Sequence, residues 1–93
     1  MITDTYLKGK GFTTKDGVTF THDVDKKTYD IVAKAFYLLN GYPIIPINES
    51  EQLDVMLKDN GSCCSWKMKG PFLFPGADLD ENGLKELFDW LGI

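Results

Sequence analysis

Pairs of glycine with asparagine or proline interrupt this chain at several places and limit it to short elements. The Asn-Gly pairs at 40–41 and 60–61 are suited to end helices, because glycine accepts the left-handed backbone conformation common there. A Gly-Pro pair at 70–71 and a Pro-Gly pair at 75–76 bracket an apolar stretch. With 93 residues and no linker between these segments, the sequence predicts one domain over residues 1–93.

The segment 25–40 has the apolar spacing of a helix, with Asp23 or Asp25 placed to cap its first backbone N–H groups. Its apolar residues cover two faces. One face has Tyr29, Val32, Ala33, Phe36 and Leu39, and the other has Ile31, Ala35 and Leu38. A helix that is apolar on two sides is either central to the fold or meets a partner on one of them.

Two further helices are expected along the chain. Ser50 is placed to cap a short helix that ends at Asp59 and turns Leu53, Met56 and Leu57 inward. The last helix spans about 80–91, and the acidic residues at its start suit the positive end of the helix dipole. Trp90 lies on its flank, and its inward stripe consists of Leu84, Leu87, Phe88 and Leu91.

Residues 11–22 predict a β-hairpin around Gly17. A three-residue loop would pair Phe12 with Phe20 and Thr14 with Val18, which keeps the apolar side chains on one face. Such a loop ends with a residue in the left-handed region, which glycine adopts without strain. This pairing is therefore the register that we expect.

Two more strands complete the expected fold. Residues 42–47 contain Pro46, which cannot donate to a ladder, so this strand belongs at a sheet edge or ends early. Residues 62–69 alternate in polarity and place Cys64, Trp66 and Met68 on the buried face. A helix between these strands would make their connection a parallel crossover. The sequence thus predicts an α+β fold: a small mixed sheet of three to five strands, including the N-terminal hairpin, with three helices packed mainly on one face.

The charge is acidic and unevenly distributed. The net charge is −4, and residues 48–93 hold four lysines against nine carboxylates, a net −5. All ten basic residues are lysine, and the lack of arginine on an acidic chain argues against direct nucleic-acid binding. No segment approaches the ~18 apolar residues of a membrane span, and the first residues lack the pattern of a signal peptide. Adjacent Cys63 and Cys64 cannot join distant segments, which favours reduced thiols and a cytoplasmic location.

Catalytic and metal-binding patterns are incomplete. Residues 78–83 match the opening of a calcium loop, but Lys85 and Asp89 stand where an aliphatic residue and a closing glutamate belong. An acidic helix N-terminus is the simpler interpretation. The two cysteines and His22 are too few for a closed zinc site and lie outside the setting that activates a thiolate. We therefore expect no catalytic residue, no metal and no cofactor.

The apolar segment 71–75 and the acidic last helix contain the candidate interaction residues, which are Phe72, Phe74, Glu86, Asp89 and Trp90. The two phenylalanines are either pinned in the core or exposed as a binding loop. An aromatic side chain beside carboxylates is suited to an interface with a basic partner, because charge steers the encounter and the ring supplies affinity.

These observations favour a small non-enzymatic binding protein that acts as an inhibitor, immunity or regulatory factor on a larger macromolecule. The expected partner is a protein with a basic surface. Accessory proteins of phages and mobile elements are often built in this way, and this association extends the hypothesis to a host-virus interaction. The alternative is a small enzyme or ligand-binding domain with a pocket under the Phe72–Phe74 loop. A homo-oligomer is compatible with both hypotheses.

Overall fold

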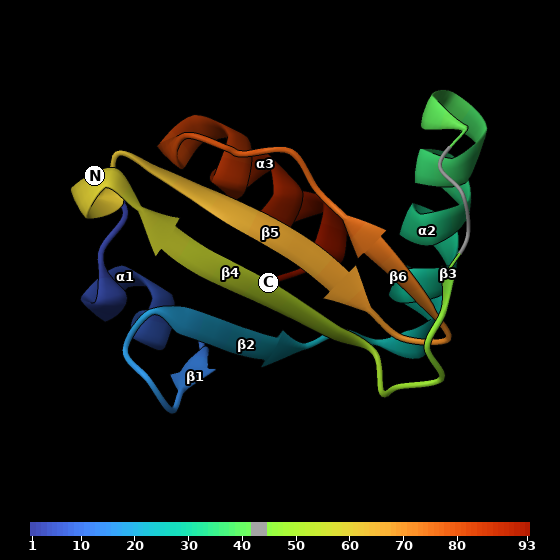
Figure 1. The fold of residues 1–93 in the computed structure, drawn as a ribbon, viewed down its shortest axis with the longest axis horizontal. Helices are drawn as coiled ribbons and strands as arrows, with labels where there is room; N and C mark the ends of the chain where they lie inside the picture. The colour runs from blue at the N-terminus through green and yellow to red at the C-terminus, as the bar shows by residue number, and fades with distance from the viewer. Residues whose placement is uncertain (42–44) are drawn as a thin grey trace.

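The computed structural model describes residues 1–41 and 45–93, which form an antiparallel sheet with three helices on one of its faces (Figure 1). The helices are α1 Asp4–Gly9, α2 Lys26–Asn40 and α3 Glu81–Leu91, and a 3-10 turn, η1, spans Asp59–Gly61. The strands are β1 Thr13–Thr14, β2 Thr19–Asp23, β3 Ile45–Pro46, β4 Gln52–Lys58, β5 Cys63–Lys69 and β6 Phe72–Pro75. The expected α+β class, with its N-terminal hairpin and three helices on one face, is confirmed.

The strands lie in the order β1-β2-β4-β5-β6-β3, and every pairing among the described residues is antiparallel, so the expectation of a mixed sheet is wrong. The sheet has four strands of four residues or more, which agrees with the expected three to five. The two-residue strands β1 and β3 at its edges bring the total among the described residues to six. The edge position expected for the strand around Pro46 is confirmed by β3, which pairs with β6. Residues 42–44 of that predicted strand lie outside the described residues.

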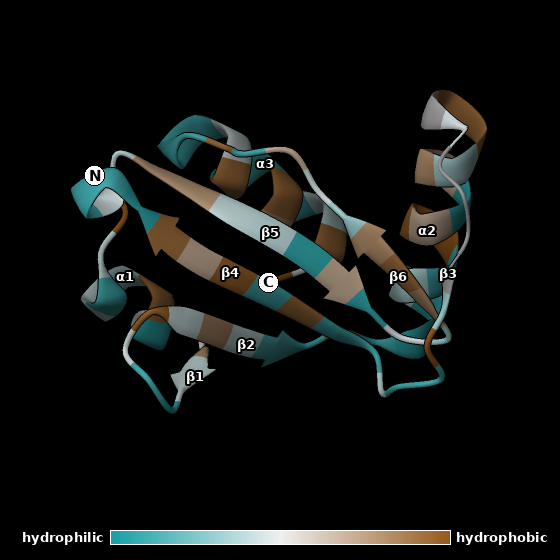
Figure 2. Cartoon of the chain, viewed as in Figure 1, coloured by the Kyte–Doolittle hydropathy of each residue, from teal (hydrophilic) through white to brown (hydrophobic). Residues whose placement is uncertain are grey.

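The register gives the sheet a buried face and an open face. Two rows across the central strands form the buried face, Phe20, Val55 and Trp66 in one and Leu53, Met68 and Phe74 in the next. The opposite face has mostly polar rows, such as Thr21, Asp54 and Lys67, and no helix covers it in the part of the chain that is described (Figure 1). The side chains of β4 and β5 alternate between these two faces, and Figure 2 shows both apolar and polar residues along each of the two strands. A sheet with one solvated face commonly has this alternation.

Residues 52–58 form strand β4, so the helix expected from Ser50 to Asp59 and the parallel crossover through it are wrong. Leu53, Val55 and Leu57 alternate with polar or exposed residues, and this period of two explains Val55, which the helical pattern left on its polar side. All seven residues of β4 pair with β5. In a short apolar run, such pairing on both edges outweighs local helix propensity.

The hairpin between β1 and β2 has a longer loop than expected. Thr14 lies opposite Phe20, so the expected pairs of Phe12 with Phe20 and of Thr14 with Val18 are wrong. The carboxylate of Asp16 accepts hydrogen bonds from the amide of Val18 and from the amide after it, at 2.9 and 2.8 Å. These bonds satisfy two backbone amides that, in a shorter loop, would pair with the opposite strand. The glycine of this loop has the expected left-handed φ of 76°.

Helix α1 is an element that we did not expect. Thr3 is its N-cap and accepts a hydrogen bond from the amide of Tyr6 at 3.0 Å. Ile2 just before the cap and Leu7 four residues after it are both buried. This is the spacing of a hydrophobic staple, which is the sequence signal that predicts this helix.

Helix α2 has the expected bounds, with Asp25 as its N-cap and Gly41 in the left-handed conformation at its end. Its first half is buried against the sheet, but its last turns extend past it (Figure 1). Leu39, expected on the inner face, is 76% exposed, so the inner face of the helix ends before this residue. Ile31 and Leu38 on the second apolar face are exposed as well.

Candidate functional site: an aromatic pocket between α2, β6 and α3

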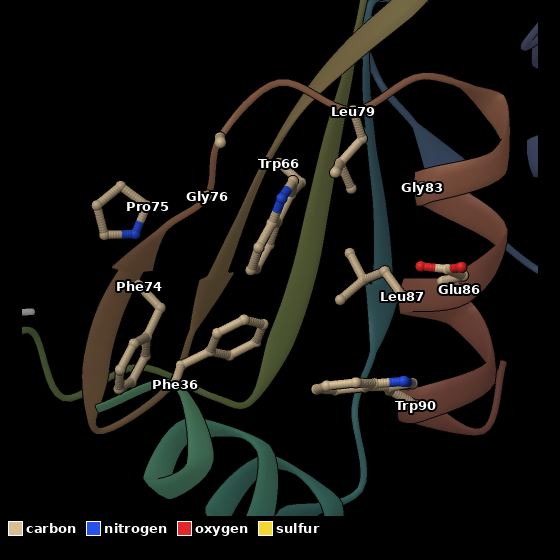
Figure 3. Close-up of a pocket in the computed structure, with 11 residues that line it drawn as sticks. Phe36, Trp66, Phe74, Pro75, Gly76, Leu79, Gly83, Glu86, Leu87 and Trp90 are labelled. Carbon is tan, nitrogen blue, oxygen red and sulfur yellow. The ribbon is translucent and has the colours of Figure 1, made fainter. Parts of the chain in front are cut away.

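A hollow of about 300 Å³ opens between α2, the end of β6 and α3. We call it the aromatic pocket. Its lining residues are Phe36, Trp66, Phe74, Pro75, Gly76, Ala77, Leu79, Gly83, Glu86, Leu87 and Trp90. Figure 3 shows these side chains arriving from segments far apart in the sequence, with α3 forming one wall and the sheet with Phe36 forming the other. The fold therefore builds this pocket from long-range contacts.

Three aromatic rings define the open end of the pocket. The ring centroid of Phe36 lies 5.5 Å from that of Trp66 and 6.2 Å from that of Trp90, with interplanar angles of 42° and 31°. Trp90 extends from α3 toward Phe36 across this end (Figure 3), and 58% of its surface is exposed. The exposed ring of Trp90 therefore borders the open end of the pocket.

Helix α3 supplies one wall through the spacing of its residues. Gly83, Glu86, Leu87 and Trp90 have the spacing i, i+3, i+4 and i+7 and therefore share one side of the helix. The carboxylate of Asp80 caps the helix by accepting a hydrogen bond from the amide of Gly83 at 2.8 Å. This cap fixes the residue at which the helix begins, and therefore the position of each side chain along the pocket wall.

Glu86 provides the one carboxylate among the lining residues. It is exposed, and it makes no ion pair or hydrogen bond with residues 1–41 or 45–93. Its negative charge is therefore available to a group that enters the pocket.

The floor of the pocket depends on close packing between Gly76 and Trp66. The amide of Gly76 donates to the carbonyl of Trp66 at 2.8 Å, and a side chain at residue 76 would overlap the indole ring. Nε1 of Trp66 is buried beneath this contact and has no hydrogen-bond partner in the part of the chain that is described. The indole is therefore held in place by sterics rather than by a hydrogen bond.

Three of the five candidate interaction residues meet in the aromatic pocket: Phe74, Glu86 and Trp90. Asp89 is exposed on α3 and does not line it. Phe72 lies beside a separate shallow hollow, where its backbone amide and carbonyl both bond to the Tyr29 hydroxyl. The segment is thus split, with Phe74 buried and Phe72 exposed.

Sequence reasoning missed Phe36 and Trp66 as pocket residues. Both were expected to face the core, and both do pack against it. Their apolar spacing could not show that α2 and α3 diverge at this point and leave their rings at a surface. The predicted face of β5 is otherwise confirmed, because Cys64 and Met68 are fully buried.

A second, polar hollow lies on the open face of the sheet, with Asp54 in its floor. Asp54 is buried, accepts a hydrogen bond from the Thr21 hydroxyl at 3.0 Å and pairs with Lys69 at 3.0 Å. The hydrogen bond to Asp54 raises the pKa of the Lys69 ammonium. The buried Asp54 carboxylate is therefore held by a structural ion pair with the partly exposed Lys69, which also pairs with Glu49 at 3.7 Å.

Asp78, Asp80 and Cys64, which lie outside these hollows or at their edge, have structural roles. Asp80 is the cap of α3, as the simpler interpretation of residues 78–83 predicts, and Asp78 pairs with Lys58 at 2.8 Å. Burial raises the pKa of the Cys64 thiol to about 11, which suppresses its thiolate form. Within residues 1–41 and 45–93, no three histidine, cysteine or acidic side chains gather as metal ligands. No helix in these ranges is long and apolar enough to span a membrane.

Comparisons with known proteins found no family model, no curated protein and no solved structure that matches this chain.

Proposed function

We propose that this protein is a non-enzymatic binding protein that attaches to a larger protein through the aromatic pocket and thereby inhibits or regulates it. One observation supports this proposal above the others: Trp90 is exposed over an apolar pocket that is also lined by Glu86, whose carboxylate has no ion-pair partner among the described residues. Exposed tryptophans around well-packed pockets are typical of the residues that dominate binding energy at protein interfaces. The free cysteines suit a reducing cytoplasm as the place of action.

The size of the aromatic pocket favours a side chain of a partner over a whole small molecule. Its volume of about 300 Å³ equals the lower end of the range typical of small-molecule sites. It is also open rather than enclosed on the side of Trp90 (Figure 3). An open, shallow pocket beside exposed ring surface is suited to an anchor residue from a flat protein surface.

The chemistry of the lining favours binding over catalysis. Glu86 is the one titratable side chain among the lining residues. General acid–base or nucleophilic catalysis needs a second group that activates, protonates or orients the first. Among the described lining residues there is no such second group, and this favours binding as the proposed function.

A peptide-display selection against the purified protein tests the proposal. Selected peptides should bind wild type and an Asn82→Ala control, since Asn82 is exposed on α3 but does not line the pocket. Their affinity for Trp90→Ala should fall by about tenfold or more, because truncation removes the exposed anchor surface. Circular dichroism should show both variants folded.

Two results would contradict this function. Peptides that bind Trp90→Ala as tightly as wild type would place the binding surface elsewhere. A selection that yields no peptide above the background of uncoated support would argue against a peptide-binding pocket altogether.

A further inference from the structure

We infer that the aromatic pocket accepts an arginine side chain of the partner protein. This inference rests on the proposed function, and it specifies the chemistry of the group that enters. Three features of the pocket support it: the exposed indole of Trp90, the charge of Glu86, which makes no ion pair among the described residues, and the acidity of the surrounding half of the chain.

The positions of Trp90 and Glu86 on α3 allow one cationic group to contact both the indole ring and the carboxylate. Glu86 and Trp90 are four residues apart on α3, so their side chains are neighbours on the helix surface. In Figure 3 the carboxylate of Glu86 lies on the same side of α3 as the indole of Trp90, one turn away. A cation between them would contact the π-face of the ring and the carboxylate together.

The charge of the pocket favours a cation over an uncharged apolar group. An aliphatic occupant would cover the Glu86 carboxylate and remove its water without replacing those hydrogen bonds, which is costly. No lysine lines the aromatic pocket to neutralise that carboxylate. The excess of five negative charges in residues 48–93 also attracts a basic surface.

Arginine suits this arrangement better than lysine does. Its planar guanidinium can stack on an indole face and still donate two parallel hydrogen bonds to a carboxylate. It is also more weakly hydrated than an ammonium group, so its transfer into an aromatic pocket costs less. None of the 93 residues is an arginine, so these residues of a second copy do not supply the group, and we infer that a different protein does.

Four capped pentapeptides that differ at one residue provide the test: acetyl-Gly-Ala-X-Ala-Gly-amide, with X as arginine, lysine, citrulline or norleucine. Citrulline has the shape of arginine without its charge. Both tryptophans of the chain line the pocket, so their two indole N–H signals in ¹H–¹⁵N spectra report occupancy directly. The arginine peptide should shift the Trp90 signal and bind about tenfold more tightly than the citrulline peptide.

Matched variants separate contact from general charge. Glu86→Gln should remove most of the preference for arginine over citrulline and leave the weak norleucine binding unchanged. Asp30→Asn makes the same change of charge at an exposed residue of α2 that does not line the aromatic pocket, and it should preserve that preference.

The outcomes distinguish this inference from the function on which it rests. If citrulline, norleucine or lysine shifts Trp90 at the same concentrations as arginine, the choice of arginine is wrong while the pocket remains a binding site. If Glu86→Gln and Asp30→Asn lower the arginine affinity equally, the carboxylate contact is wrong. If none of the four peptides shifts either indole signal at millimolar concentration, both the inference and the proposed function fail.

Discussion

At the scale of single residues, Cys63 and Cys64 are adjacent but lie in opposite environments. Cys64 is fully buried on the core face, and burial raises the pKa of its thiol to about 11. Cys63 is half-buried, and its thiol donates to the Asp59 carboxylate at 3.4 Å. Partial burial and that carboxylate raise the pKa of Cys63 as well.

We expect the native protein to expose one slowly reacting thiol to Ellman's reagent at neutral pH, and two in denaturant. Because the folded Cys64 thiol keeps its proton above the ordinary pKa of 9.0, unfolding releases that proton at high pH. The free energy of unfolding should therefore fall between about pH 9 and pH 11, and Cys64→Ala should reduce this slope. Equal labelling rates for the two native thiols would contradict the burial of Cys64.

At the scale of elements, the ion pair of Asp54 and Lys69 links β4 to β5 on the open face. The Asp54 side chain is 7% exposed, so Lys69→Met leaves a nearly buried carboxylate with the Thr21 hydroxyl alone among the bonds described. We expect this variant to lose about 3 kcal/mol of unfolding free energy in urea titrations. The double variant Asp54→Leu with Lys69→Met should recover most of the loss, because it removes the unpaired charge.

The pH dependence of that ion pair follows from Lys69. Its pKa is raised in the fold by Asp54, so the stabilisation is fully present below the ordinary lysine pKa of 10.5. It is lost as pH rises through the higher folded value. The difference between wild type and Lys69→Met should therefore shrink in strongly alkaline buffer, and a difference that grows there would contradict the pairing.

Elements with complete local signals were predictable from the sequence. Helices α2 and α3 each have a capping aspartate, an apolar stripe and a terminal glycine, and β5 has an unbroken alternation. Strand β4 was not predictable, because Leu53, Met56 and Leu57 fit a helix as well as Leu53, Val55 and Leu57 fit a strand. Only its pairing with β2 and β5 decides between the two periods.

At the scale of the whole molecule, the candidate site shows the same limit. The sequence indicated Phe74, Glu86 and Trp90 because each belongs to a local pattern of apolar or acidic residues. It could not show that Phe36 and Trp66 join them, since these residues lie 54 and 24 positions before Trp90. They come close to Trp90 only in the folded protein. The spacing of residues along the sequence therefore gives little indication of a pocket that forms by contacts between distant segments.

The charge distribution of the whole molecule predicts how binding kinetics respond to substitution. Asp89 is exposed near the aromatic pocket but does not line it, so Asp89→Lys should act through the long-range field rather than through contact. Changing one aspartate to lysine takes the net charge from −4 to −2. Association with a basic peptide or partner should slow several-fold at low salt, with little change in dissociation.

Salt and a contact variant complete this kinetic test. The effect of Asp89→Lys should vanish near 1 M salt, where the screening length falls to about 3 Å. Trp90→Ala should show the opposite pattern in stopped-flow traces, with faster dissociation at every salt concentration, because the lost ring surface acts only after contact. If Asp89→Lys leaves association unchanged at low salt, the acidic half of the chain does not steer the partner. If Trp90→Ala slows association instead, the ring acts before the complex forms, and the anchor role of the aromatic pocket is wrong.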